Sequence, residues 1–470
     1  MLNDIGGFLA DSDVRSHPER LEEMIDAAGG SMDDFAPLIL GYLRGCTQQQ
    51  SPDPDLPLDY VHHVLTFIKH ADAFPVDCEH EWMTIPVGSF GRALYEADFA
   101  EELVSAVLLF CDGDKPHDDA QYAIDGCMKL MYRMVFMSSP AFWAEFLERG
   151  FLRALVLITL KCETHGWRLN HYVRFFLQVQ LPPALVYYYI VGTLEESLEK
   201  VRGLISGDDF KRCAVYAQWQ HFLAHAQERL DAHDEFAFRT VAYKTCDNLR
   251  CGSIEYTECI AGRCSGCQAF YYCSRRCQKV DWKAGHRTFC DSHQRLLLTQ
   301  KEQRLLFVER SFLRYLVHRK YLNERRSILA QQVTILAAQT VGERGAPPVL
   351  FTLFDFQKSP PLITVYIADV GLEGLKGLEL KEPDGTPSPE WEDLVERARR
   401  SQGRMQLHGV RILESPPHVW VIPLRSESAE GYERLLDLAG RVRAGEVEET
   451  GVPEEIEGIL GSLGNVVEVH

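Results

Sequence analysis

The sequence lacks a hydrophobic run long enough to cross a membrane as a helix. Its longest apolar run, Pro182–Leu194, has 13 residues, three of them tyrosine, whereas a membrane-spanning helix needs about 20. The first residues, Met1–Ile5, also lack the basic start and the long apolar stretch of a secretory signal peptide. We therefore expect an intracellular protein, with the nucleus and the cytoplasm both open.

The common catalytic motifs are also missing. The sequence contains no Gly-x-Ser-x-Gly elbow, no P-loop and no His-Glu-x-x-His. His221 and His225 are spaced to share a helix face, but no third metal ligand accompanies them, so ordinary packing is the simpler interpretation. We therefore expect a protein without enzymatic activity.

Basic residues are outnumbered by acidic ones, 49 against 68. They gather in the middle of the chain. The formal net charge is −19, and by count residues 1–243 contribute −18, residues 244–326 contribute +9 and residues 351–470 contribute −10. A basic centre between acidic flanks can attract an acidic partner or nucleic acid. Solvated helix faces that partly neutralise their neighbours are the alternative explanation.

Residues 1–243 show the apolar periodicity of successive helices, without a strict repeat. Helices are expected within 35–43, 60–68, 101–110, 123–136, 141–159 and 210–225. Gly150 separates two helices in the fifth of these ranges. Helix pairs on this scale suggest an irregular solenoid of the armadillo or HEAT type. A compact all-helical domain is the alternative.

The C-terminal half predicts a change of fold class. Residues 295–342 contain little Gly or Pro and predict two helices that pack on the N-terminal helices. Residues 349–445 predict a small α+β domain. Its expected strands are 349–356, 362–370, 405–413 and 418–424, and its expected helices are 390–400 and 430–442. Residues 446–470 are expected to form an acidic, solvated tail. The chain is thus mainly α with a small α+β C-terminal domain.

Eight of the 14 cysteines lie between Cys246 and Cys290, and one histidine joins them at ligand spacing. Seven of these cysteines and the histidine form four pairs: Cys246-x4-Cys251, Cys264-x2-Cys267, Cys273-x3-Cys277 and His286-x3-Cys290. Four pairs of thiolate and imidazole ligands suffice for two tetrahedral zinc ions. The other six cysteines are scattered through apolar surroundings and are expected to be buried reduced thiols, which argues against disulfides in the cluster.

Four pairs in this order predict a cross-braced arrangement. The first and third pairs would bind one zinc ion, and the second and fourth pairs the other. Ser274 can cap a helix that Gly285 ends, and Tyr272, Trp282 and Phe289 offer a minimal core. Because this segment is too short to build a large core of its own, zinc would supply most of its folding free energy. Cys259 is a spare thiol on the loop between the first two pairs.

The segment resembles the MYND zinc finger. The resemblance rests on three stretches. They are Cys264-Ser265-Gly266-Cys267, Tyr272-Cys273-Ser274-Arg275-Arg276-Cys277-Gln278 and Asp281-Trp282-Lys283-Ala284-Gly285-His286-Arg287. It covers about 45 of 470 residues, and the last stretch is similar to versions found in fungal proteins. One departure is the spacing of the first pair, where four residues intervene between Cys246 and Cys251 and the family usually has two.

The resemblance implies a protein-binding module that docks short proline-containing peptides without catalysis. In the family, a glutamine and a tryptophan of the finger helix line the groove, and Gln278 and Trp282 hold those positions here. They are four residues apart and therefore share one face of a helix. A flat apolar ring beside an amide suits a proline-rich peptide. A Trp282 wholly inside the core is the alternative.

Two other functions remain as alternatives. Nucleic-acid binding would use the basic finger helix, with Arg275, Arg276, Lys279, Lys283 and Arg287, and the aromatic Tyr271. MYND fingers also occur in SET-domain lysine methyltransferases. Their Asn-His-Ser-Cys-like motif follows the finger, whereas the Asn170-His171 pair precedes it here and continues with Tyr172. We expect an adaptor rather than either alternative.

Overall fold

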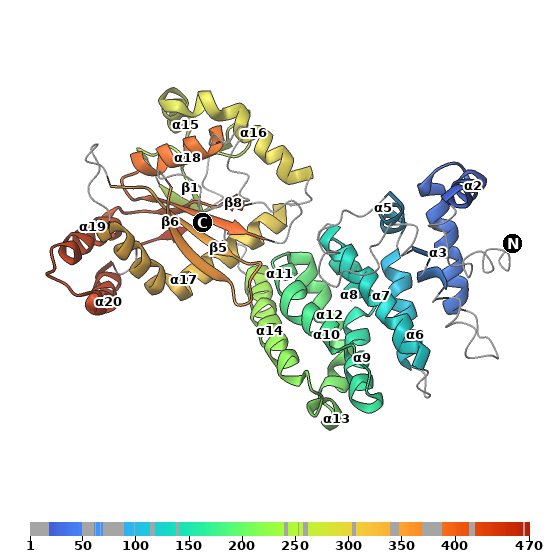
Figure 1. Ribbon diagram of the computed structural model, residues 1–470. Helices are drawn as coiled ribbons and strands as arrows, with labels where there is room; N and C mark the ends of the chain where they lie inside the picture. The colour runs from blue at the N-terminus through green and yellow to red at the C-terminus, as the bar shows by residue number, and fades with distance from the viewer. Residues whose placement is uncertain are drawn as a thin grey trace. The chain divides into compact units, whose positions relative to one another are not determined.

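The computed structural model describes most of the chain (Figure 1). The described residues are 18–48, 61, 63–65, 67–68, 89–97, 99–112, 118–137, 141–238, 243–251, 253–256, 262–302, 307–338, 347–368, 388–412, 419–463 and 466–470. They divide into two compact units. The first unit comprises residues 1–182 and 189–227, and the second comprises residues 183–188 and 228–470. None of the described helices is long and apolar enough to cross a membrane.

The described part of the first unit is built from helices. They are α2 (Pro18–Ala28), α3 (Met32–Gln48), α5 (Ser89–Glu96), α6 (Phe99–Asp112), α7 (Asp118–Met137), α8 (Ala141–Glu148), α9 (Phe151–His165), α10 (Asn170–Phe175), α11 (Leu181–Ala184), α12 (Tyr188–Ile205), α13 (Asp208–Lys211) and α14 (Tyr216–Phe238). A π-helical turn, η2 (Phe176–Gln180), joins α10 to α11, and α14 continues into the second unit.

Aromatic side chains fill the core of the first unit. The rings of Phe35, Phe67 and Phe90 lie within 6.0 Å of one another, between centroids. Gly150 separates α8 from α9 as predicted, and its φ of 96° is a conformation that favours glycine. The all-helical prediction is confirmed for the described residues. The armadillo or HEAT repeat stays a prediction, since helix length varies from four residues in α13 to 23 in α14.

The second unit contains the predicted α+β domain. Its strands are β5 (Leu350–Asp355), β6 (Leu362–Ile367), β7 (Met405–Arg411), β8 (Val419–Val421), β9 (Leu424–Ser426) and β10 (Glu468–Val469). The sheet order is β10-β9-β7-β5-β6, and β8 also pairs with β7. Strands β5 and β7 run parallel, and the crossover between them contains α18 (Pro389–Arg400).

Helices cover the two faces of this sheet. On one face Trp391 of α18 meets Phe351 edge-on, with centroids 5.2 Å apart. Side chains alternate along a strand, so the opposite face carries His408, which lies against Tyr321 of α17 (Phe307–Ala338). Helices α19 (Glu430–Arg443) and α20 (Val452–Leu463) both contact α17.

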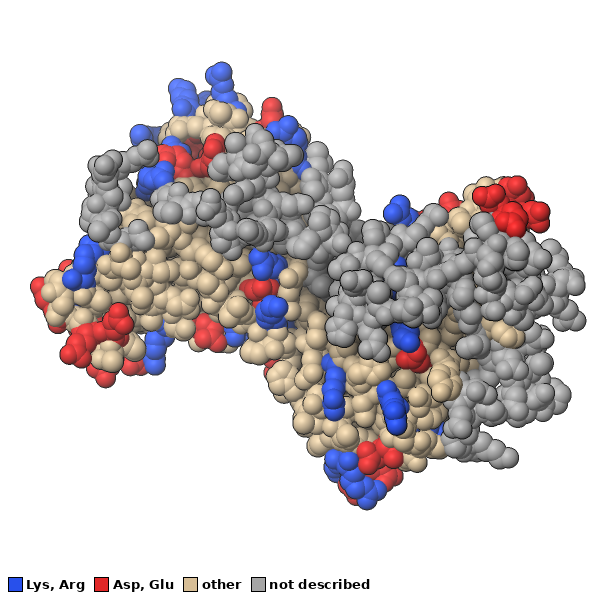
Figure 2. Space-filling model, in the orientation of Figure 1, with Lys and Arg blue, Asp and Glu red and all other residues tan. Residues whose placement is uncertain are grey.

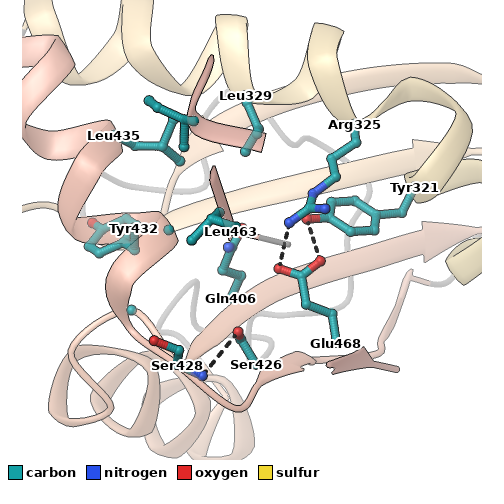
Figure 3. Close-up of a pocket in the computed structure, with 13 residues that line it drawn as sticks. Tyr321, Arg325, Leu329, Gln406, Ser426, Ser428, Tyr432, Leu435, Leu463 and Glu468 are labelled. Carbon is teal, nitrogen blue, oxygen red and sulfur yellow. Dashed lines mark hydrogen bonds and ion pairs between the residues drawn. The ribbon is translucent and has the colours of Figure 1, made fainter. Parts of the chain in front are cut away.

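The structure corrects two predictions for this region and extends a third. The expected acidic tail is instead the helix α20 and the strand β10, which pairs with β9. The helix buries Val452, Ile456 and Leu463 and turns its glutamates outward. Figure 3 shows the carboxylate of Glu468 of β10 facing Tyr321 and Arg325, and both side chains bond it.

The other two predictions concern α17 and the last expected strand. Helix α17 packs on β5, β6, α19 and α20 within the second unit. The predicted packing on N-terminal helices is found in its first half, where Phe312 meets Tyr188 of α12 and His233 and Phe236 of α14. The single strand expected over 418–424 is divided into β8 and β9. Pro423 lies between them and has no N–H to donate to a ladder.

Four of the scattered cysteines are buried free thiols, as expected. They are Cys111, Cys127, Cys162 and Cys213. Burial raises the pKa of the Cys162 thiol to about 11, which keeps it protonated and unreactive. The side chains of Cys46 and Cys78 lie outside the described residues.

Candidate metal centre

Short strands and a broken helix bring the cysteine and histidine pairs together. Strand β1 (Tyr243–Thr245) pairs with β2 (Ile254–Tyr256), and β3 (Gly262–Arg263) pairs with β4 (Tyr271–Tyr272). The chain then forms α15 (Arg275–Asp281), a π-helical turn η4 (Trp282–His286) and α16 (Arg287–Glu302). In Figure 1, α15 and α16 lie beside α18 of the α+β domain.

The first site contains Cys246, Cys251, Cys273 and Cys277, whose sulfurs all lie within 4.8 Å of one another. The sulfur of Cys273 is 3.7 Å from that of Cys251 and 3.5 Å from that of Cys277. Cys246 is buried and the other three are partly exposed. This site therefore lies nearer to solvent than the second one.

The second site contains Cys264, Cys267, His286 and Cys290, all four buried. His286 Nε2 lies 3.3 Å from the sulfur of Cys264 and 3.6 Å from that of Cys267. The sulfurs of Cys264 and Cys290 are 3.8 Å apart. His286 therefore presents Nε2, rather than Nδ1, to the centre of the site.

These spacings fit zinc. In a tetrahedron with Zn–S bonds of about 2.3 Å, two sulfurs lie about 3.8 Å apart. The distances of 3.5–3.8 Å between sulfurs match this value. The first and third pairs form one site and the second and fourth pairs the other, so the predicted cross-brace and the predicted two zinc sites are confirmed. Cys259 lies outside the described residues.

The local geometry explains how one helix serves both sites. The Ser274 hydroxyl accepts a hydrogen bond from the Cys277 N–H at 3.2 Å and caps α15, which places Cys273 and Cys277 at the first site. Gly285 has a φ of 152° inside the π-helical turn. The backbone leaves the helical conformation at Gly285, where the sequence predicted the end of the helix, and α16 begins at Arg287. The glycine lets the chain turn so that His286 and Cys290 reach the second site.

Burial and hydrogen bonds shift the pKa values of the ligands in different directions. Loss of solvent lowers the pKa of His286 to about 4, so that its imidazole is neutral near pH 7 and Nε2 can bind a metal ion. Burial also raises the pKa of Cys267 to about 12. Burial alone would raise the pKa of Cys277. Hydrogen bonds with Ser274, Asn248 and neighbouring thiols outweigh this effect and lower the pKa to about 7. Of these two thiols, Cys277 of the first site therefore ionises more readily than Cys267 of the second.

A buried ion network joins the finger to the α+β domain, and sequence reasoning missed it. Arg397 of α18 donates from Nη1 and Nη2 to the two carboxylate oxygens of Asp281, at 3.2 and 3.0 Å. Its Nε donates to Asp393 at 3.0 Å, and His293 contacts the same carboxylate at 2.9 Å. The Tyr272 hydroxyl also donates to Asp281. All five side chains are buried.

The same arginine reaches the second metal site through an aromatic ring. The Arg397 guanidinium lies 4.6 Å from the centroid of the Phe270 ring. Phe270 in turn lies against the imidazole of His286, with centroids 4.4 Å apart. Helix α18 therefore supports a metal ligand through a cation–π contact and a ring contact.

Three further contacts fix the finger to the same domain. Arg425 of β9 donates to the Asp247 carboxylate at 2.8 Å. Arg400 of α18 donates to the Ala284 carbonyl at 3.1 Å, and Arg404 bonds the carbonyl of Leu249. Each contact comes from an arginine far away in sequence, and only the folded chain shows it.

Gln278 and Trp282 lie at the surface of the finger. Trp282 is 39% exposed, and the edge of its indole meets the His286 ring, with centroids 5.7 Å apart. Gln278 is partly buried, one helical turn before it. The indole is therefore held by a ligand of the second site while part of its surface faces solvent.

Two cross-braced sites of four Cys and His ligands define a two-zinc finger. Residues 246–290 match the family model of the MYND finger, and this segment is a MYND zinc finger. Fingers of this family generally mediate protein–protein interaction. A search of curated proteins and a search of solved structures with this chain both gave no match.

Proposed function

We propose that this protein is a non-enzymatic adaptor whose MYND finger docks a proline-containing peptide of a partner protein. The observation that carries the proposal is the exposure of Trp282, which is 39%. An indole kept half in solvent, beside the Gln278 amide, suits a peptide whose prolines stack on the ring and whose carbonyls accept hydrogen bonds. Aromatic side chains that become buried when a partner binds carry much of the binding free energy of an interface.

The metal sites support a role in binding rather than in catalysis. Each site brings four protein ligands to one ion, and a closed tetrahedron leaves no position to activate water. The zinc ions would hold the finger in shape. The contact between Trp282 and His286 would link the docking ring directly to a zinc ligand.

Peptide display tests this proposal with the full chain. One library would carry a fixed proline among random positions, and a second would exclude proline. We expect the wild-type protein to enrich sequences from the proline library only, and Trp282→Ala to lose that enrichment. Leu322→Ala is the matched control, since Leu322 is an apolar side chain of the second unit, 51% exposed and remote in sequence from the finger. Enrichment that survives Trp282→Ala would reject the docking face.

A further inference from the structure

We propose that the partner peptide is acidic, with aspartate or glutamate flanking its prolines. This inference rests on the proposed function and adds the charge of the partner to it. The evidence is the distribution of charge on the finger helix. Its basic side chains are exposed, whereas its carboxylate is buried and paired.

The finger helix shows almost only positive charge to solvent. Between Ser274 and Cys290 the sequence contains a single acidic residue, Asp281. Asp281 is only 4% exposed, and Arg397 and Tyr272 bind its carboxylate. The five exposed cations are Arg275, Arg276, Lys279, Lys283 and Arg287. Figure 2 shows Lys and Arg side chains projecting at the end of the second unit where α15 lies, with Asp and Glu side chains also visible there.

Two of these cations lie close to the indole of Trp282 on the helix surface. Residues three, four and seven positions apart lie on one side of a helix. Arg275 precedes Gln278 by three positions and Trp282 by seven, and Lys279 precedes Trp282 by three. A peptide lying across the indole would therefore pass beside both charges. Arg276 and Lys283 lie further round the helix from the indole, about 120° and 100° from Trp282, whereas Arg275 and Lys279 lie about 20° and 60° from it.

The acidic groups nearest in sequence or structure do not neutralise this face. Glu396 of α18 accepts ion pairs from Arg399 and Arg400 on its own helix. Asp291 is exposed, but it lies on α16, beyond the break in the helix at Gly285. No ion pair joins Arg275 or Lys279 to a carboxylate within the described part of the chain. Carboxylates of a partner would provide complementary charge for both residues.

A peptide fits this face better than nucleic acid does. The stripe from Arg275 to Trp282 spans eight residues of helix, about 10 Å, and it contains two cations around one aromatic ring and one amide. Affinity for nucleic acid comes largely from contacts between basic side chains and many phosphates. Two charges beside an apolar platform suit a short chain with a few carboxylates and a proline core.

The test compares synthetic peptides that share one proline core taken from the display experiment. In one peptide glutamates flank the core, and in the other glutamines do. At about 0.05 M salt we expect the glutamate peptide to bind about tenfold tighter, and the difference to shrink at about 0.5 M salt. The double variant Arg275→Glu with Lys279→Glu should remove the preference for glutamate.

The matched control is the double variant Arg276→Glu with Lys283→Glu, which changes the charge equally but further round the helix from the indole. It should retain most of the preference, and both variants should keep two zinc ions. Equal affinity for the two peptides, or equal loss in both variants, overturns the acidic partner while the docking proposal stands. If an oligonucleotide binds tighter than either peptide, nucleic acid replaces the peptide. A failure of every library peptide to bind overturns the docking proposal itself.

Discussion

Arg397 and Asp281 form a bidentate ion pair in which both side chains are almost completely buried, with 1% and 5% of their surfaces exposed. Asp281 ends the first helical segment of the finger, and Arg397 lies on the helix that covers the C-terminal sheet. Nearby Asp393 and Asp281 hold the pKa of Arg397 above its usual range, although burial acts in the opposite direction. The finger and the α+β domain are thus joined by a charged contact inside their shared interior.

Removing this arginine should destabilise the second unit strongly. We expect Arg397→Met to lower the free energy of unfolding by about 3–5 kcal/mol, because Asp281 and Asp393 would remain as buried carboxylates without their partner. Denaturant unfolding followed by tryptophan fluorescence measures the change. Arg399→Met on the same helix is the control, since Arg399 pairs with Glu396 at the surface, and it should cost less than about 1 kcal/mol. Equal costs for the two variants would contradict the buried network.

Ligand spacing was enough to predict the two metal sites, because zinc ligands come in close pairs and a cross-brace follows from the order of the pairs. The buried ion network around the sites could not be predicted from local spacing. Asp281 and Arg397 are 116 residues apart, and an arginine on an amphipathic helix is ordinarily exposed. The contact depends on how α18 packs, which no local pattern encodes.

The C-terminal region shows a similar limit. The strands β5, β6 and β7 follow from their β-branched and aromatic runs, and the predicted and observed ranges overlap closely. The many glutamates of residues 446–457 led to the prediction of an acidic tail, although Val452, Ile456 and Leu463 form an apolar stripe on α20. Strand β10 has two residues, too few to show an alternating pattern. Such a strand forms only because β9 offers a free edge.

Replacing one ligand should remove one metal ion. We expect Cys267→Ser to leave one zinc ion per chain, because serine is a poor zinc ligand and the second site would keep three ligands. Elemental analysis of the purified protein measures the stoichiometry. The control is Cys213→Ser, a buried cysteine of the first unit that belongs to neither site, and it should keep two ions. Two ions in Cys267→Ser would contradict the ligand assignment.

The two sites should release zinc at different rates. Three ligands of the first site are partly exposed, whereas all four ligands of the second are buried. With excess chelator we therefore expect two kinetic phases in a colorimetric zinc assay, with the first site emptied first. Cys277→Ser should abolish the fast phase, and Cys267→Ser should abolish the slow phase. The reverse assignment, or a single phase of two ions, would show that burial does not control release.

Acid should destabilise the C-terminal sheet through a buried histidine. Burial lowers the pKa of His408 from 6.5 to about 3, and its Nδ1 lies 2.7 Å from Nε2 of His470. Between these pH values the unfolded chain binds a proton that the folded chain does not. The stabilisation is complete above pH 6.5 and is lost as the pH falls, by about 2 kcal/mol at pH 5 for this one group.

Urea unfolding at pH 7 and pH 5 measures this effect. We expect His408→Gln to reduce the difference in unfolding free energy between the two pH values. His221→Gln should leave the difference unchanged, because His221 is exposed. An unchanged pH difference in His408→Gln would show that this histidine does not contribute to the acid sensitivity.

The most direct measurement is the affinity of a display-selected proline peptide for the wild-type chain and for Trp282→Ala, determined by isothermal titration calorimetry. The indole supplies the apolar surface of the docking face, so its removal should weaken binding by about 2 kcal/mol or more. Zinc content should stay at two ions, and Leu322→Ala should bind like the wild type. A peptide that binds Trp282→Ala as tightly as the wild type, with both ions retained, would contradict the peptide-docking function.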